Sequence, residues 1–191
     1  MTRPDGAPAP ASRDAVTVRA QRPGERALVR DVITRAFGGV VVADLAEALQ
    51  DAPAGAGGLS FVAELDGRPV GHVQLSRSWV DAPRQLVEVL VLSPLSVIPE
   101  CQRQGIGGRL VRRAVDEAAR AAAPMVFLEG SPRYYGRFGF HAARARGFTP
   151  PSVRIPDDAF QVLTLPGYQP WMTGALVYAE QFWAYDCVGR R

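Results

Sequence analysis

Hydrophobic and polar positions alternate with a period of two in some segments and recur at helical spacing in others, which predicts a mixed α and β domain. Alternation over 16–20 predicts a first strand. From Pro23, apolar residues recur at helical spacing until two glycines follow Phe37, so a helix is predicted over 23–37. A second, shorter helix is predicted over 43–49.

A hairpin is predicted in the next part of the chain. The segments 59–65 and 70–76 have the pattern of strands, and Asp66 and Gly67 lie between them. Both residue types tolerate the positive φ of a tight turn. Two antiparallel neighbours are therefore expected.

The segment 86–92 is apolar almost throughout, as in a strand buried on both faces. Pro94 lacks the N–H that a sheet ladder needs, so a bulge or splay is predicted there. A long amphipathic helix over 105–123 and a buried strand over 125–128 follow, and the two strands should be parallel. Further elements are predicted as a short aromatic helix over 132–138 and strands from Phe140, over 160–165 and over 175–179. These elements indicate an α/β (α+β) fold.

Length and composition indicate a single domain over 16–191. Residues 1–15 hold three prolines among small residues, as in a disordered leader. The hydrophobic fraction of 47% and the charged fraction of 21% are close to globular averages, which argues against a disordered chain or a membrane protein. No run approaches the roughly 18 apolar residues of a spanning helix, and no secretion signal precedes the domain, so a cytoplasmic location is expected.

Arginine supplies all of the basic charge. The 22 Lys and Arg residues are all arginine, which with the abundant alanine indicates a bacterial chain from a GC-rich genome. The net charge of +3 suits an anionic ligand, but the arginines are scattered, which argues against nucleic acid as a partner. Cys101 and Cys187 are too few for a disulfide scaffold and lack metal-ligand spacing, so no metal site is predicted.

A glycine-rich segment over 102–109 opens the long predicted helix. Glycine lets a diphosphate approach the backbone, and the unpartnered N–H groups of the first helical turn can point at it. A Walker A loop needs a lysine, which the chain lacks, and a Rossmann fingerprint needs glycine where Leu110 stands. A competing interpretation is that the glycines only allow the helix to pack closely on a strand.

Two motifs resemble those of the GNAT acetyltransferase superfamily. The first is Gln-x-x-Gly-x-Gly, at Gln102, Gly105 and Gly107, preceded by a Val-x-Pro-Glu turn. The second is Tyr-x-x-x-Gly-Phe over 135–140, and the two motifs occur in the family's order. The resemblance implies a central mixed, mostly antiparallel sheet of about seven strands, splayed between strands 4 and 5 and flanked by helices.

The longer aromatic run over 134–140, the Pro-Asp-Asp-Ala-Phe run at 156–160 and a late Gly-Ala-Leu-Val-Tyr strand resemble a YhbS-like bacterial branch of this family. That resemblance covers about 16–186. Ser131 stands where the branch has Asp, so no role of its side chain carries over. The residues that the family likeness implies at acetyl-CoA are Leu95, Ser96, Val97, Gln102, Arg103, Gln104, Gly105, Ile106, Gly107, Gly108, Arg109, Ser131 and Tyr135.

The resemblance implies an N-acetyltransferase in which an amine attacks acetyl-CoA directly in a ternary complex, without a metal or a cysteine nucleophile. Tyr135 would protonate the departing sulfur, although a core aromatic is the structural alternative. Tyr134 lies about 100° away on a helix and is expected to pack or to line the acceptor pocket. An amide freed by Pro94, that of Val97 first, would bind the acetyl oxygen.

The general base is less well defined by the sequence. Glu129, at the end of a predicted strand, and Glu88 are candidates that act through a water, and an ion-paired carboxylate is the alternative for each. His72 and His141 are expected to be structural.

The sequence does not identify the acceptor amine. The acidic residues Asp44, Glu47 and Asp51 would draw a cationic amine, or would only form a solvated face. Small amines, an antibiotic, a polyamine, a peptide N-terminus and a protein lysine all fit, and a homodimer is a further expectation. A different class of function is a non-catalytic acyl-CoA sensor or partner-binding module on the same fold.

Overall fold

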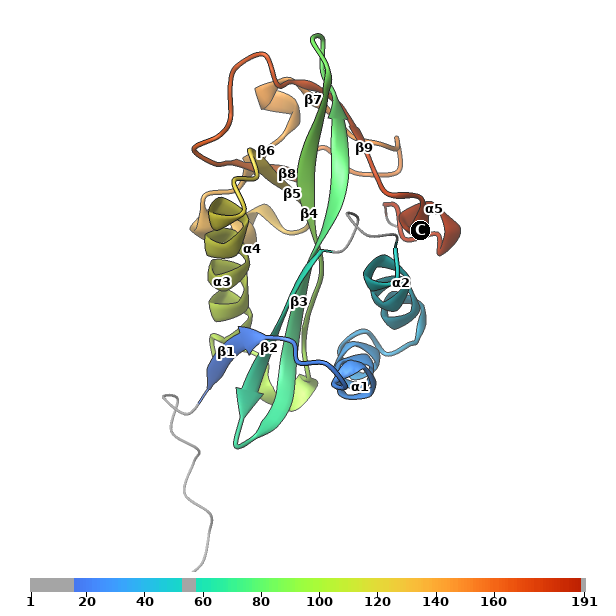
Figure 1. The fold of residues 1–191 in the computed structure, drawn as a ribbon, viewed down its shortest axis with the longest axis vertical. Helices are drawn as coiled ribbons and strands as arrows, with labels where there is room; N and C mark the ends of the chain where they lie inside the picture. The colour runs from blue at the N-terminus through green and yellow to red at the C-terminus, as the bar shows by residue number, and fades with distance from the viewer. Residues whose placement is uncertain (1–15, 53–57, 190–191) are drawn as a thin grey trace, which may run out of the picture.

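The computed structural model describes residues 16–52 and 58–189, so the predicted leader lies outside the described residues. The predicted helices and strands occur in the predicted order, and the structure adds short elements at Pro99–Cys101, Arg144–Arg146, Phe148–Thr149 and Glu180–Ala184 (Figure 1). In chain order they are β1 (Thr17–Ala20), α1 (Arg26–Phe37), α2 (Val41–Gln50), β2 (Leu59–Leu65), β3 (Arg68–Asp81), β4 (Leu86–Val97), η2 (Pro99–Cys101), α3 (Ile106–Arg120), β5 (Met125–Glu129), α4 (Pro132–Tyr135), η3 (Gly136–Phe138), β6 (His141–Ala142), η4 (Arg144–Arg146), β7 (Phe148–Thr149), β8 (Phe160–Thr164), β9 (Gly174–Val177) and α5 (Glu180–Ala184).

The described strands form one mixed sheet in the order β1-β2-β3-β4-β5-β8-β6, with β9 paired to β3 and β7 paired to β9. The β4–β5 and β7–β9 pairs are parallel and the others antiparallel, which confirms the predicted mixed, mostly antiparallel sheet. The described part of the sheet has nine strands, where about seven were expected. β6 corresponds to the strand predicted from Phe140, whereas β7 was missed because its two residues are too few to produce a pattern.

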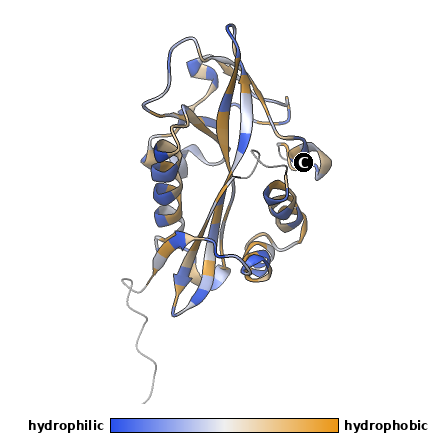
Figure 2. Cartoon of the chain, viewed as in Figure 1, coloured by the Kyte–Doolittle hydropathy of each residue, from blue (hydrophilic) through white to orange (hydrophobic). Residues whose placement is uncertain are grey.

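Helices cover both faces of the sheet. Figure 1 shows α3 on one face and α1, α2 and α5 on the other. Leu110 of α3 is fully buried against the sheet on its side, and Leu45 of α2 and Phe182 of α5 are buried in a second core on the opposite side. Figure 2 shows hydrophobic residues concentrated in the central strands and hydrophilic residues along the outer side of α3. No helix of the described residues is long and apolar enough to cross a membrane.

The sheet opens between β4 and β5. These strands pair only at Leu90 with Val126 and at Val91 with Phe127, although both strands continue further. On its other edge, β4 has a bulge, because Leu92 pairs with Leu75 while Leu95 pairs with Val73. The bulge contains a cis Ser93-Pro94 bond, and it confirms the interruption predicted at Pro94.

After the bulge, the backbone groups of β4 alternate in direction. The N–H of Ile98 donates to the carbonyl of Val70 on β3 at 3.0 Å. Because consecutive residues of an antiparallel strand turn their N–H groups to opposite sides, the N–H groups of Leu95 and Val97 turn away from β3. They therefore point to the edge of β4 where β5 has diverged.

Candidate active site

The N-terminus of α3 is a backbone cradle. Gly105 caps the helix in the left-handed conformation with φ of 84°, and the first N–H to close a turn is that of Arg109, which donates to the Gly105 carbonyl at 3.2 Å. The N–H groups of Ile106, Gly107 and Gly108 therefore have no acceptor within the helix. Their dipoles favour an anion at this end of α3.

A basic pocket of about 430 Å³ adjoins this helix end. Its three charged residues are all arginines, and among the described residues no carboxylate lines it. The guanidinium of Arg137 lies over the Tyr134 ring at 4.7 Å and that of Arg112 over the Phe138 ring at 5.4 Å. The residues that line it are Arg103, Gly105, Gly107, Gly108, Arg112, Tyr134, Arg137 and Phe138.

The glycine loop and the aromatic helix contact each other, although about 30 residues separate them in sequence. A Cβ at Gly107 would lie 2.5 Å from the phenol oxygen of Tyr134, and one at Gly108 would lie 3.3 Å from Cζ of Phe138. Glycine at these positions leaves room for the aromatic side chains and keeps the backbone amides accessible. The two sequence motifs thus form one site.

Four other predicted contact residues lie outside the lining of the basic pocket, and two of them hold the loop in place. The Gln102 side chain donates to the Val97 carbonyl at 3.0 Å and that of Gln104 to the Glu100 carbonyl at 3.1 Å. Arg109 donates to the Val16 carbonyl of the chain just before β1 at 2.9 Å, so it does not line the basic pocket. Ser131 is exposed and precedes α4 without a side-chain cap.

Sequence reasoning did not identify Arg112, Arg137 and Phe138 as lining residues. Arg112 lies one helical turn after Gly108, on the same side of α3. The four-residue spacing from Gly108 could therefore have identified Arg112 as a lining residue. Arg137 and Phe138 lie within the aromatic motif itself, but their direction depends on how α4 packs on α3.

Tyr134 and Tyr135 have different surroundings, as expected for neighbours on a helix. Their rings are 4.9 Å apart and nearly perpendicular, at 82°. The Tyr135 ring packs where β5 ends: a Cβ at Gly130 would lie 2.3 Å from its Cε2, and the Phe140 ring is 5.9 Å away. Burial raises the pKa of Tyr135, so its phenol stays protonated.

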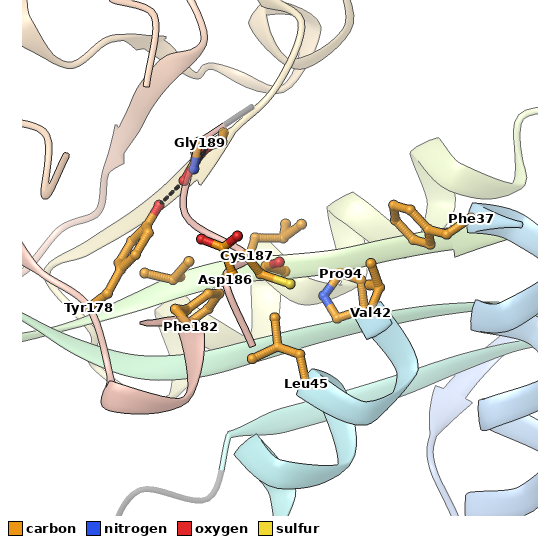
Figure 3. A pocket seen from close by; sticks show the side chains of 13 residues that line it. Phe37, Val42, Leu45, Pro94, Tyr178, Phe182, Asp186, Cys187 and Gly189 are labelled. Atoms are coloured by element: carbon orange, nitrogen blue, oxygen red, sulfur yellow. Dashed lines mark hydrogen bonds between the residues drawn. The ribbon is translucent and has the colours of Figure 1, made fainter. Parts of the chain in front are cut away.

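An acidic pocket of about 330 Å³ lies on the other face of the sheet (Figure 3). Figure 3 shows Val42 and Leu45 entering it from α2, and Phe182, Asp186 and Cys187 from the C-terminal segment. Its lining consists of Phe37, Val42, Leu45, Val91, Leu92, Ser93, Pro94, Glu129, Tyr178, Phe182, Asp186, Cys187 and Gly189.

Glu129 is held in this pocket by neutral donors. The Tyr178 phenol donates to its Oε1 at 2.9 Å, and the Gly189 N–H donates to its Oε2 at 3.1 Å. Burial raises the pKa of Glu129 above its usual value, and the two hydrogen bonds oppose that shift. Tyr178 and Gly189 were not identified from sequence, because they are 49 and 60 residues from Glu129.

The other candidate bases lie outside both pockets. Glu88 is paired with Arg77 at 3.1 Å, away from the opening between β4 and β5. His72 is fully buried, where burial lowers its pKa to about 3, and it contacts the Ser60 hydroxyl at 2.8 Å. His141 is exposed on β6. The surroundings of His72 fit the structural role that was expected for it.

The acidic residues near α2 are occupied by arginines of α1. Arg30 pairs with Asp44 at 2.6 Å and also with Glu47, while Arg26 pairs with Asp51 at 2.8 Å. None of these three carboxylates lines the acidic pocket. Of the two explanations for them, the structure favours a charged face that links the two helices.

The cysteines differ in position. Cys187 lines the acidic pocket, whereas Cys101 lies in η2 before the cradle. Burial raises the pKa of both thiols, which makes them weaker nucleophiles at neutral pH. No group of three or more potential metal ligands occurs among the residues with a described position.

Comparisons with known proteins agree with this geometry. Residues 27–140 match the Acetyltransferase (GNAT) family. The chain is 33% identical over 162 residues to the uncharacterized N-acetyltransferase YjhQ of Escherichia coli, covering 78% of this chain and 90% of that protein. A crystal structure of the GNAT N-acetyltransferase YhbS from Escherichia coli in complex with CoA aligns with a TM-score of 0.76 and 25% identity, over 93% of this chain and 95% of YhbS.

A GNAT acetyltransferase from Brucella melitensis, crystallised with acetyl-CoA, aligns with a TM-score of 0.70 and 30% identity, over 87% of this chain and 97% of that one. The family match covers more than half of the chain, and the YjhQ relative is matched along most of its length. The chain is therefore a member of the GNAT family of acetyltransferases.

Proposed function

We propose that this protein transfers the acetyl group of acetyl-CoA to a primary amine by direct attack in a ternary complex. One observation carries the proposal: two pockets of opposite charge adjoin the same short stretch of β4, from opposite faces of the sheet. Pro94 lines the acidic pocket, and the side chain of Leu95 would lie 3.9 Å from a Cβ at Gly107 in the basic pocket. An anionic acetyl donor and a cationic amine can therefore meet at this opening.

The basic pocket suits the diphosphate of coenzyme A. Three amides of the first turn of α3 can donate to it, and Arg103, Arg112 and Arg137 supply positive charge around it. Two of the solved relatives hold CoA or acetyl-CoA, which supports the same ligand here.

Removing a proton from the amine is the larger energetic demand. An alkyl amine with a pKa of about 10.4 costs roughly 4.6 kcal/mol to deprotonate at pH 7. Glu129 accepts this proton, directly or through a water. Its raised pKa brings its proton affinity closer to that of the amine and makes it a stronger base than an exposed carboxylate.

The acyl transfer itself requires a donor at the acetyl oxygen and a proton for the sulfur. The N–H of Val97 turns toward the opening and donates to the oxygen as negative charge develops. The new N–C bond forms as the C–S bond breaks, and the Tyr135 phenol donates its proton to the sulfur. The acetylated nitrogen then loses its second proton to solvent, which gives the neutral amide. Tyr135 regains a proton from solvent, and Glu129 releases the one that it took from the amine.

Release of free thiol from acetyl-CoA, with and without each member of a panel of primary amines, tests the proposal. We expect amine-dependent thiol release and a product mass 42 Da above that of the amine, because an acetyl group replaces one hydrogen. Tight acetyl-CoA binding without turnover of any amine would instead identify the chain as a non-catalytic acyl-CoA sensor.

A further inference from the structure

The charge of the acidic pocket contrasts with that of the whole chain. The chain carries a net charge of +3, but the two charged residues that line this pocket among the described residues are Glu129 and Asp186. The hydrogen-bond donors to Glu129 are neutral, so no cation is bonded to its carboxylate, and the charge of Arg154 acts on it less strongly than these two hydrogen bonds do. Asp186 accepts from Arg154 at 2.8 Å, and Arg154 itself does not line the pocket.

The remaining walls are largely apolar. Val42 and Leu45 project from α2, and the Phe182 ring lies 4.6 Å from the Tyr178 ring on the other side. Phe37, which is 51% exposed, contributes an aromatic wall at the end of α1. A ligand that fills this pocket therefore needs an apolar body as well as a cationic group.

The size of the pocket limits the ligand further. About 330 Å³ is near the lower end of the range of small-molecule sites, roughly 300–1,000 Å³. We propose that the acceptor is a compact primary amine with an aromatic or branched aliphatic body and no carboxylate. This inference rests on the proposed function, because it names the substrate class of the same site.

An α-carboxylate on the substrate is the feature that this pocket excludes. In an amino acid it lies next to the reacting amine, so it would be placed close to Glu129 when the amine is there. Two like charges about 4 Å apart at a protein surface repel strongly enough to lower binding by at least 100-fold. Amino acids and acidic peptides should thus be poor acceptors, even when their side chains fit the apolar walls.

The decisive comparison uses 2-phenylethylamine and L-phenylalanine, which differ by one carboxylate. With saturating acetyl-CoA, thiol release should give a kcat/KM at least about 100-fold higher for 2-phenylethylamine. Equal or better turnover of L-phenylalanine, or of a lysine-containing peptide, would overturn the inference while leaving the proposed acetyltransferase activity intact.

Two variants link the preference to this pocket. Asp186→Asn removes one negative charge and the ion pair with Arg154 but leaves the Glu129 side chain in place, and asparagine tolerates the positive φ of 52° at this position. This variant should lower the ratio of kcat/KM for 2-phenylethylamine to kcat/KM for L-phenylalanine about tenfold. Val42→Phe fills the pocket and should raise KM for 2-phenylethylamine about tenfold, whereas Val41→Phe, on the same helix but outside the lining, should not.

Calorimetric titration of 2-phenylethylamine into the protein with CoA bound separates binding from chemistry. If Val42→Phe weakens this binding while no amine in the panel releases thiol from acetyl-CoA, the result would support the pocket assignment and contradict the proposed function. Turnover of other amines without binding of 2-phenylethylamine would contradict the inference alone.

Discussion

The two pockets that adjoin the opening between β4 and β5 differ in charge and in how they are built. The basic pocket has three arginines and no carboxylate in its described lining, while the acidic pocket has two carboxylates and no basic residue. The basic pocket draws on two neighbouring segments of the chain, 103–112 and 134–138, whereas the acidic pocket combines residues from 37 to 189. Binding of the acetyl donor is thus encoded locally, and choice of the acceptor depends on tertiary structure.

The largest effect should come from a charge placed in the basic pocket. Gly107→Glu would introduce a carboxylate where the diphosphate binds, and its Cβ would crowd the Tyr134 phenol. We expect at least a 100-fold loss of acetyl-CoA affinity by calorimetry. Gly39→Glu is the matched control, because its Cβ would meet nothing within 4 Å. Normal acetyl-CoA binding by Gly107→Glu would contradict the assignment of the start of α3 as the diphosphate site.

The next effect separates chemistry from binding at the junction of the pockets. Tyr135→Phe should lower kcat by roughly 100-fold and leave KM for acetyl-CoA within a few-fold, because only the proton for the sulfur is lost. Tyr134→Phe, which removes a phenol beside Gly107, should change kcat by less than about tenfold. The reverse ranking of the two variants would transfer the acid role to Tyr134.

An effect of similar size is expected on the acidic side. Glu129→Gln removes the proposed base and should lower kcat/KM about 100-fold, at the low end of what a general base contributes. Glu129 acts when deprotonated and burial raises its pKa, so wild-type activity should fall as the pH drops through that raised value. The variant should lose this part of the pH profile. Glu88→Gln, whose carboxylate pairs with Arg77 elsewhere, should retain it, and an unchanged profile in Glu129→Gln would remove Glu129 from the mechanism.

The smallest effect distinguishes two arginines of α3. Arg112→Ala should raise KM for acetyl-CoA about tenfold, and less at high salt, because it removes one charge from the basic pocket. Arg109→Ala should change KM by less than about twofold, because Arg109 donates to the Val16 carbonyl on another side of the helix. An equal effect of both substitutions would mean that the cofactor reaches beyond the basic pocket.

Much of the fold and of the basic pocket could be predicted from sequence. The interruption of β4 follows from the missing N–H of Pro94, and the cradle follows from glycines at the start of an amphipathic helix. The direction of Arg109 could not be predicted, because it depends on the position of β1 beside α3.

The acidic pocket shows why the surroundings of Glu129 could not be predicted from sequence. Glu129 could be suggested because it ends a strand next to the opening, but its partners come from the last part of the chain. Tyr178 and Gly189 belong to no local motif with it. Only the packing of α5 and the following residues against α2 and β5 brings these groups together.

Hydrogen exchange of the backbone amides, with and without CoA, is the most direct test of the central claim that the start of α3 binds CoA. The amides of Ile106, Gly107 and Gly108 lack acceptors within α3, so they should exchange rapidly in the free protein and become protected when CoA is bound. The amides over 178–189 should change little. Unchanged exchange at the start of α3, with protection confined to 178–189, would contradict the account.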